Sequence, residues 1–325
     1  MKPLLLPPNQ FHRFYRGGAR IDALRGVPQG EDGRPEDWVG STATSWGSDT
    51  EGLSRLEDGT VLKQAIEADP EAFLGPEHVA KYGDDPALLV KLLDAGERLP
   101  VHYHPGRPFA REHLGLRYGK TESWLILEAD PGAAVHVGLK EPVDPGTVRS
   151  WVDEQDAEKM LAALHEVPVQ AGDGVLVPAG TLHAIGGGIL LLELQEPTDL
   201  SVLVEWKKFG VDSGPEHLEL GWDTALESLD REPIDPAALT TPAAGSLLPK
   251  EADPYFRAHR IETGDTLDQS FSIMLITHGE GEVGGLRVQR GSTVLIPYAA
   301  GEVATAGVEG IRCLGPDPAA GDGAW

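Results

Sequence analysis

The chain has 325 residues, with 27 Lys and Arg against 52 Asp and Glu, so its formal net charge at pH 7 is −25. A charge this negative repels nucleic acid and anionic membrane surfaces, both of which are bound by basic faces. The hydrophobic fraction of 40% is ordinary for a globular protein and argues against wholesale disorder. We therefore expect neither nucleic acid nor a membrane as a partner.

The cysteine content and the N-terminal residues predict a cytoplasmic protein. Cys313 is the single cysteine, so an internal disulfide and a thiolate zinc site are both excluded. The apolar run near the start has three leucines closed by prolines, whereas a signal peptide needs ~7–15 apolar residues. No stretch approaches the ~20 apolar residues of a membrane span.

The abundance of turn residues favours β structure, since the chain contains 40 Gly and 26 Pro. Residues 1–60 are rich in Gly, Pro and Asp, and we expect irregular strands and loops there, with no helix. Apolar residues at helical spacing predict a short helix over 60–68, which Asp69-Pro70 ends. Residues 86–93 are apolar except for Lys91 and predict a buried strand.

From residue 99 to residue 204, short apolar runs alternate with turn signals at the spacing of a β-sandwich or barrel. The expected strands contain residues 124–127, 134–137, 167–169, 175–177 and 189–194. Only Asp156 to His165 shows a helical pattern within this region.

Residues 211–255 break the β pattern, with a short helix near 220–229 and a Pro-rich stretch. Strands resume after Arg260 and predict a second, smaller β domain. Both β regions contain a glycine followed six residues later by a proline, at Gly172 and Pro178 and at Gly291 and Pro297. This repeated pattern suggests an internal duplication. Only the first copy continues to a histidine.

Three histidines and a glutamate form the clearest candidate site. His102 and His104 are two apart, so on a strand both imidazoles project to one face. Glu122 follows, and His183 ends a Gly-X5-Pro-X-Gly-X2-His run whose turn delivers it from a strand end. Imidazole and carboxylate ligands suit Zn²⁺, Fe²⁺, Mn²⁺ or Ni²⁺. A His-X-His pair alone also occurs as an ordinary surface pair.

These residues resemble the cupin superfamily and, more narrowly, the class I mannose-6-phosphate isomerases. The matching segments are Leu89-Val-Lys-Leu-Leu-Asp-Ala95, Leu99-Pro-Val-His-Tyr-His-Pro105, Gly119-Lys-Thr-Glu-Ser-Trp-Leu-Ile-Leu127, Val177-Pro-Ala-Gly-Thr-Leu-His-Ala-Ile185 and Glu193-Leu-Gln-Glu-Pro-Thr-Asp199. The resemblance implies a mainly β bicupin, that is, two jelly-roll barrels with a few short helices. We expect a metal-binding domain over 1–210, a connector over 211–255 and a smaller cupin-like domain without metal ligands over 256–325.

The resemblance also implies an aldose-ketose isomerase that acts on a sugar or sugar phosphate through a cis-enediol. Its metal, most readily Zn²⁺, would be held by His102, His104, Glu122 and His183. The expected catalytic residues are Lys120 and Glu193, and the expected substrate-binding residues are Arg111 and Trp38. A solvated lysine, a structural glutamate hydrogen bond and a surface ion pair of Arg111 with Glu112 are the alternatives for these positions.

Among the departures from the family pattern, one leaves the metal open and another leaves the substrate open. The first metal-binding position usually carries Gln and here is His102, so the metal itself could differ. Leu203 stands where the family has the arginine linked to phosphate binding. Either the cations Arg107, Arg111, Arg117 and Lys120 include a replacement anion clamp, or the substrate carries no phosphate. A cupin dioxygenase and a non-catalytic carbohydrate-binding cupin are the alternative functions.

Overall fold

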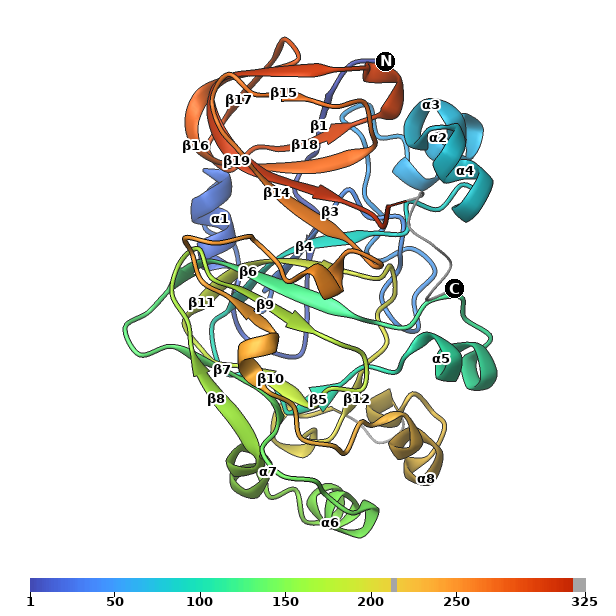
Figure 1. The fold of residues 1–325 in the computed structure, drawn as a ribbon, viewed down its shortest axis with the longest axis vertical. Helices are drawn as coiled ribbons and strands as arrows, with labels where there is room; N and C mark the ends of the chain where they lie inside the picture. The colour runs from blue at the N-terminus through green and yellow to red at the C-terminus, as the bar shows by residue number, and fades with distance from the viewer. Residues whose placement is uncertain (212–214, 318–325) are drawn as a thin grey trace.

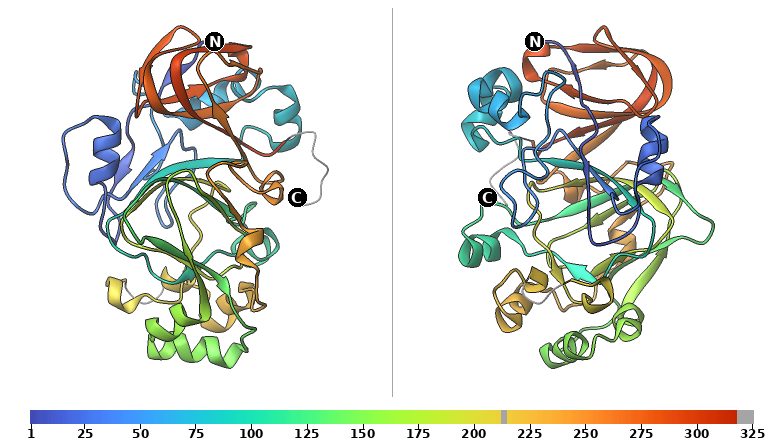
Figure 2. Two further views of the ribbon diagram at one scale, coloured as in Figure 1. Left: turned by 60° about the vertical axis from the view of Figure 1, so that its left-hand side comes forward. Right: turned by 180° about the vertical axis from the view of Figure 1, so that it is seen from behind.

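The chain folds into three antiparallel sheets arranged along the long axis of the molecule (Figure 1). The computed structural model describes residues 1–211 and 215–317. The two further views in Figure 2 keep the sheet of the C-terminal residues at one end and the helices α6 (Pro145–Glu154) and α7 (Ala157–Ala163) at the other. The prediction of a mainly β protein is confirmed.

The central sheet lies between the other two and has the order β13-β9-β6-β11-β4-β3-β2. Its strands are β13 (Thr240–Thr241), β9 (Gly174–Val177), β6 (Glu122–Ala129), β11 (Ile189–Gln195), β4 (Leu89–Ala95), β3 (Glu36–Val39) and β2 (Gln10–Phe11). Every residue of β4 and of β11 is buried, because both faces of this sheet are covered. This burial explains the continuous apolar runs that predicted two of the strands.

Side chains on β11 alternate between two cores. Leu190, Leu192 and Leu194 pack in the core shared with the C-terminal residues, whereas Leu191 faces the opposite core. Successive side chains of a strand point to opposite faces, so Glu193 lies on the side of Leu191. One face of the central sheet therefore packs in the core shared with the C-terminal residues, whereas the other face also carries polar groups.

We expect Leu192→Ala to lower the free energy of unfolding by about 2–5 kcal/mol, since Leu192 is fully buried and the cavity left behind cannot be filled. Urea unfolding curves measure this change. The half-buried Leu161 on α7 provides a matched control, with a smaller loss expected from Leu161→Ala. Equal losses at the two positions would contradict the placement of Leu192.

A five-stranded sheet of order β12-β5-β10-β7-β8 faces the polar side of the central sheet. Its strands are β12 (Val202–Leu203), β5 (His102–Tyr103), β10 (His183–Ile185), β7 (Ala134–Leu139) and β8 (Leu164–Pro168). His102 is paired with His183 on one side and with Leu203 on the other. Directly opposed residues point to the same face of a sheet, so these three side chains share a wall.

The third sheet is formed mainly by the C-terminal residues. Its strands are β1 (Leu4–Leu5), β18 (Thr293–Ile296), β16 (Ser272–Val283), β19 (Val303–Leu314), β14 (Arg257–Ile261), β15 (Thr266–Leu267) and β17 (Leu286–Gln289). β1 pairs with β18, so the first residues of the chain join this sheet. The strands expected after Arg260 are present.

Short helices connect and flank the sheets. Besides α6 and α7, the α-helices are α1 (Ala19–Arg25), α2 (Leu62–Ala68), α3 (Pro70–Leu74), α4 (Pro76–Tyr82), α5 (Arg107–Leu114) and α8 (Trp222–Ala225). The 3-10 turns are Lys207–Phe209, Pro215–His217, Leu226–Ser228, Pro236–Ala238, Lys250–Ala252 and Tyr298–Ala300. No helix in the described residues is long and apolar enough to span a bilayer.

The helix predictions were partly wrong. The helix expected over 60–68 is α2, but α1 lies in the region expected to lack helices. Its seven residues bury only Ile21, Asp22 and Leu24, which is too short a pattern to stand out. Both α5 and α6 were also missed, in a region where only one helix was expected. Asp144, whose side chain accepts from Thr147 N, caps the start of α6.

The connector expected over 211–255 and the domain expected over 256–325 include residues 212–214 and 318–325. These residues lie outside the described part of the chain.

Candidate active site

Four side chains from three segments of the chain converge between the central and five-stranded sheets. His102, His104 and His183 each contribute one ring nitrogen to a cluster whose atoms lie within 4.8 Å of one another. The Glu122 oxygens lie 3.0 Å from His104 Nε2 and 3.4 Å from His183 Nε2. The four side chains that the sequence predicts as metal ligands are therefore brought together, and all are buried.

Backbone carbonyls fix the orientation of all three imidazoles. Nδ1 of His102 lies 2.8 Å from Pro100 O, Nδ1 of His104 lies 2.6 Å from Leu200 O, and Nδ1 of His183 lies 2.8 Å from Thr181 O. A carbonyl oxygen only accepts, so each Nδ1 carries the ring hydrogen and each Nε2 is left with a free lone pair. Metal-binding histidines are typically oriented by such hydrogen bonds.

Burial and charge keep the cluster in the protonation states of metal ligands. Burial and the neighbouring cation of Lys120 lower the pKa of His104 to about 3. The pKa of His102 also lies well below its usual value, first through burial and then through its histidine neighbours. Burial alone would raise the pKa of Glu122, but Lys120 and His104 outweigh it and hold the pKa well below the ordinary range. The rings of His102 and His104 are thus neutral and lie beside an ionised carboxylate.

The donor set fits a divalent cation. Nε2 of His183 lies 3.0 Å from Nε2 of His102, although neither nitrogen carries a hydrogen for the other. Glu122 Oε2 is buried and accepts no hydrogen bond of good geometry. Lone pairs that meet without a proton between them repel one another, whereas a cation at their common point satisfies them all. The residues present therefore suit three nitrogen ligands and one carboxylate ligand.

Lys120 and Glu193, the two expected catalytic residues, lie next to this cluster. Lys120 Nζ is 3.1 Å from His104 Nε2, 3.0 Å from Glu122 Oε2 and 3.9 Å from Glu193 Oε1. Burial, opposed in part by Lys91 and reinforced by Glu122, raises the pKa of Glu193 to about 8. Near neutral pH the protonated and the ionised forms of this carboxyl group are therefore both populated. Lys120 is buried, which contradicts its interpretation as a solvated lysine.

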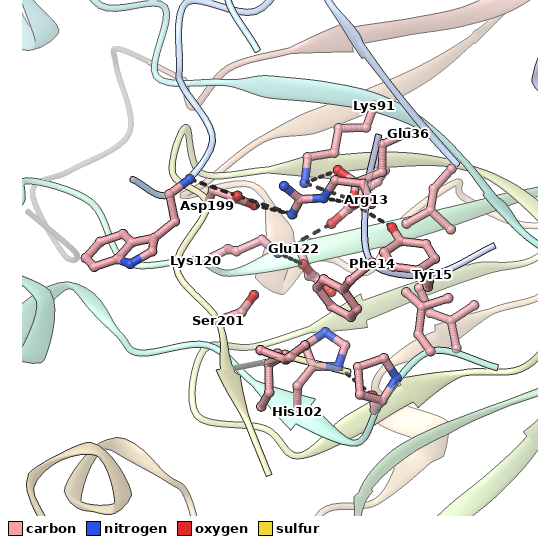
Figure 3. Close-up of a pocket in the computed structure, with 18 of the residues that line it drawn as sticks. Arg13, Phe14, Tyr15, Glu36, Lys91, His102, Lys120, Glu122, Asp199 and Ser201 are labelled. Carbon is pink, nitrogen blue, oxygen red and sulfur yellow. Dashed lines mark hydrogen bonds and ion pairs between the residues drawn. The ribbon is translucent and has the colours of Figure 1, made fainter. Parts of the chain in front are cut away.

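A cavity of about 370 Å³ opens beside the cluster (Figure 3). Its lining residues are His12, Arg13, Phe14, Tyr15, Glu36, Trp46, Lys91, Leu93, Leu99, Pro100, His102, Lys120, Glu122, Ile185, Glu193, Asp199, Ser201, Leu203, Val211 and Leu218. Phe14 and Trp46 are 42% and 38% exposed, respectively, and lie among the few large apolar side chains left open to solvent. The cavity therefore combines a polar interior with exposed aromatic groups.

The sequence analysis did not predict a network of charged side chains that lines this cavity. Arg13 Nε donates to Glu36 at 3.0 Å, and its NH2 contacts both oxygens of Asp199 at 3.2 Å. Lys91 Nζ lies 3.5 Å from Glu36 and 3.9 Å from Glu193, its partner across the strands. The only sequence signal was the single charge of Lys91 within an apolar strand. Arg13, Glu36 and Asp199 come from separated segments, and the sequence analysis assigned none of them a role, although Asp199 ends one of the matching segments.

Neither expected substrate-binding residue lines the cavity. Arg111 lies on α5 and is exposed to solvent. Trp38 is fully buried, with its indole nitrogen donating to Glu36 at 2.7 Å and its ring beneath Lys91. The structure thus makes Trp38 a support for Glu36 and Lys91, because a fully buried ring cannot contact a ligand.

The suggested anion clamp is not assembled either. Arg107 is buried in an ion pair with Glu196, and Arg117 donates to the Tyr82 carbonyl. Of the four cations proposed for the clamp, only Lys120 lines the cavity.

Comparisons with known proteins agree with the sequence motifs, although no protein family model matches the chain. The mannose-6-phosphate isomerase of Streptococcus mutans is 28% identical over 298 residues, covering 87% of each chain. Mannose-6-phosphate isomerase ManA of Bacillus subtilis is 39% identical over 121 residues, 36% of each chain.

Solved structures show the same fold. The mannose 6-phosphate isomerase from Bacillus subtilis superposes with a TM-score of 0.76 at 23% identity, covering 96% of this chain and 99% of that one. A mannose 6-phosphate isomerase bound with zinc and yttrium superposes with a TM-score of 0.72 at 15% identity, covering 98% and 100% of the two chains. In sequence and fold, the chain is therefore similar to mannose-6-phosphate isomerases.

Proposed function

We propose that the protein is a metal-dependent aldose-ketose isomerase that acts on a sugar or sugar phosphate through a cis-enediol. The observation that carries this proposal is the placement of a buried carboxyl group of raised pKa, Glu193, beside a three-histidine and glutamate cluster in one cavity. The similarity to mannose-6-phosphate isomerases supports the same reaction class.

The proposed metal ligands are His102, His104, Glu122 and His183, with Zn²⁺ as the preferred ion. The ligand chemistry equally suits Fe²⁺, Mn²⁺ or Ni²⁺, but a zinc-bound relative of the same fold favours zinc. When bound, such an ion supplies the electrophilic charge that stabilises an enediolate.

We assign the proton transfer between C1 and C2 to Glu193. Its carboxylate form accepts a proton from one carbon, and its acid form returns the proton to the other, which requires both forms near the working pH. Lys120 forms ion pairs with Glu122 and Glu193, and its ammonium group carries hydrogens that it can donate. It would hold a sugar oxygen near the carboxyl group.

We also propose that the fold is a bicupin of two jelly-roll barrels. Separate apolar cores support this division, one containing Trp124, Val135 and Leu191 and the other Met274 and Val294. The first barrel would correspond to residues 1–210 and hold the site, with a connector over 211–255. The second would correspond to residues 256–325, together with the strand pairing of β1, and would carry no metal ligands.

Solvent-proton exchange tests the proposed reaction. Zinc-loaded protein incubated in D2O with aldoses, with and without a terminal phosphate, should yield the corresponding ketose and incorporate deuterium at C2 of the recovered aldose. Proton nuclear magnetic resonance follows both changes. Sugar binding without either change in a metal-replete sample would instead favour a carbohydrate-binding protein. Oxygen consumption by an iron-loaded sample would favour a dioxygenase.

We expect His102→Gln to retain metal and at least about one tenth of the wild-type kcat, because the amide oxygen is also a metal ligand. His104→Gln should lose more, since His104 lies against both Glu122 and Lys120. Metal content and initial rates measure both effects. A greater loss at position 102 than at position 104 would contradict this ranking.

A further inference from the structure

Each lysine and arginine among the described lining residues of the cavity lies next to a carboxylate. Among the lining residues that the structure describes, Arg13 spans Glu36 and Asp199, and Lys91 lies within 4 Å of Glu36 and Glu193. Lys120 lies 3.0 Å from Glu122. Four carboxyl groups therefore face three cations. A phosphate dianion bound here would compete with these carboxylates for every donor.

Lys207, Lys208 and Arg98 are close in sequence to lining residues but do not line the cavity themselves. Lys207 and Lys208 are exposed and do not line it. Arg98 makes two contacts of 2.6 Å with Glu205. His12 does line the cavity, but its ring is 65% exposed and lies 3.9 Å from Glu31.

The wall beside the metal cluster is apolar. Leu203 is directly paired with His102 across β12 and β5, lines the cavity and is 7% exposed. Val211 and Leu218 line the cavity as well. None of these side chains can donate a hydrogen bond to an anion, and burying an unpaired dianion against them is costly.

The same cavity suits an uncharged polyol. The Asp199 carboxylate can accept a further hydroxyl hydrogen, and the Ser201 hydroxyl can both donate and accept. The exposed rings of Phe14 and Trp46 offer flat apolar surfaces to the C–H faces of a sugar.

We propose that the substrate is an unphosphorylated aldose and its ketose, with Leu203 as a specificity-determining residue that excludes a terminal phosphate. This inference rests on the proposed isomerase function. It narrows the substrate class to neutral sugars. The cavity supplies hydroxyl-binding groups and aromatic surfaces, and each lysine and arginine among its described lining residues already has a carboxylate neighbour.

The first experiment compares binding of mannitol and mannitol phosphate, which are unreactive, to the metal-loaded protein by titration calorimetry. We expect the phosphate to increase affinity of the wild type by no more than about threefold, because each lysine and arginine among the described lining residues is already next to a carboxylate. Affinity for mannitol phosphate at least about tenfold above that for mannitol would overturn the proposal, whether or not the protein is an isomerase.

The second experiment measures kcat/KM for neutral aldoses, including mannose, and for their terminal phosphates. We expect a preference of at least about tenfold for a neutral sugar. A preference for a phosphorylated sugar would overturn the substrate class while supporting the isomerase. If no sugar reacts but mannitol binds as expected, the isomerase proposal fails and the neutral ligand class is supported.

Leu203→Arg tests the specificity residue, with Leu203→Met as an uncharged control of similar volume. Leu203→Arg should shift the ratio of mannitol phosphate to mannitol affinity by at least about tenfold toward the phosphate, and Leu203→Met by less than about twofold. An unchanged ratio in folded Leu203→Arg would overturn the role of Leu203. The wild-type comparisons decide the substrate class even if this variant does not fold.

Discussion

Replacing His183 with alanine is expected to lower bound zinc to below about one tenth of the wild-type content and kcat/KM by at least about a thousandfold. His183 is fully buried, with Nε2 directed at His102 and Glu122, so its loss removes a nitrogen from the proposed ligand set. A thousandfold loss corresponds to about 4 kcal/mol of transition-state stabilisation, which is a reasonable share for a metal ion.

Metal analysis and thermal unfolding with and without zinc measure this effect separately from activity. Zinc should raise the melting temperature of the wild type, because it binds only the folded state, and should leave that of His183→Ala unchanged. His136→Ala is the matched control. His136 lies on the adjoining strand and pairs with Ala184, one position from His183, but belongs to no ligand cluster. Full zinc binding by His183→Ala would contradict the proposed ligand set.

The metal cluster was predictable because its members lie in short local patterns. His102 and His104 are two residues apart, and the glycines and proline before His183 form a recognisable turn. Glu193 was predictable for a different reason, since a carboxyl group in an otherwise apolar strand requires a partner or a function. Each of these signals can be recognised from the neighbouring residues in the sequence alone.

The cavity network could not be predicted in this way. Arg13 and Asp199 are 186 residues apart in sequence, and their contact depends on how the N-terminal segment crosses the central sheet. Lys91 did carry a signal, but assigning Glu193 as its partner required the register between β4 and β11. Sequence reasoning therefore identified the metal ligands and missed the groups that distinguish one substrate from another.

Helix α1 was missed because its pattern is short, whereas β4 was anticipated because both of its faces are covered. A strand buried on two sides is continuously apolar, and that pattern is visible without knowledge of its neighbours. Trp38 illustrates the reverse error. Its sequence context suggested substrate contact, but its ring is fully buried and contacts Glu36 and Lys91, which line the cavity.

Glu193→Gln is expected to lower kcat by about 10²–10⁴-fold with little change in KM, because the amide matches the carboxyl group in shape but cannot transfer a proton. Rates measured across pH in zinc-loaded protein test this loss. Glu128→Gln, at an exposed position of β6, is the matched control and should leave kcat unchanged. Retention of more than about one third of wild-type kcat by Glu193→Gln would remove Glu193 from the proposed mechanism.

The same substitution should stabilise the metal-free protein at alkaline pH. Burial raises the pKa of Glu193 to about 8 from its ordinary value of 4.5. The folded state thus binds this proton more tightly than the unfolded state does. The resulting stabilisation is complete below about pH 4.5 and is lost as the pH rises through about 8.

Glutamine does not titrate, so the free energy of unfolding of Glu193→Gln should exceed that of the wild type by an amount that grows with pH. The expected gain is near zero at pH 5 and a few kcal/mol at pH 9, at about 1.4 kcal/mol for each unit of pKa difference. Lys91, Lys120, Glu36 and Glu122 surround the carboxyl group and are retained in the variant. Urea unfolding at pH 5, 7 and 9 measures the trend. A stability difference that stays constant over this range would show that Glu193 is ionised throughout, and its assignment as the proton-transfer group would then lose its physical basis.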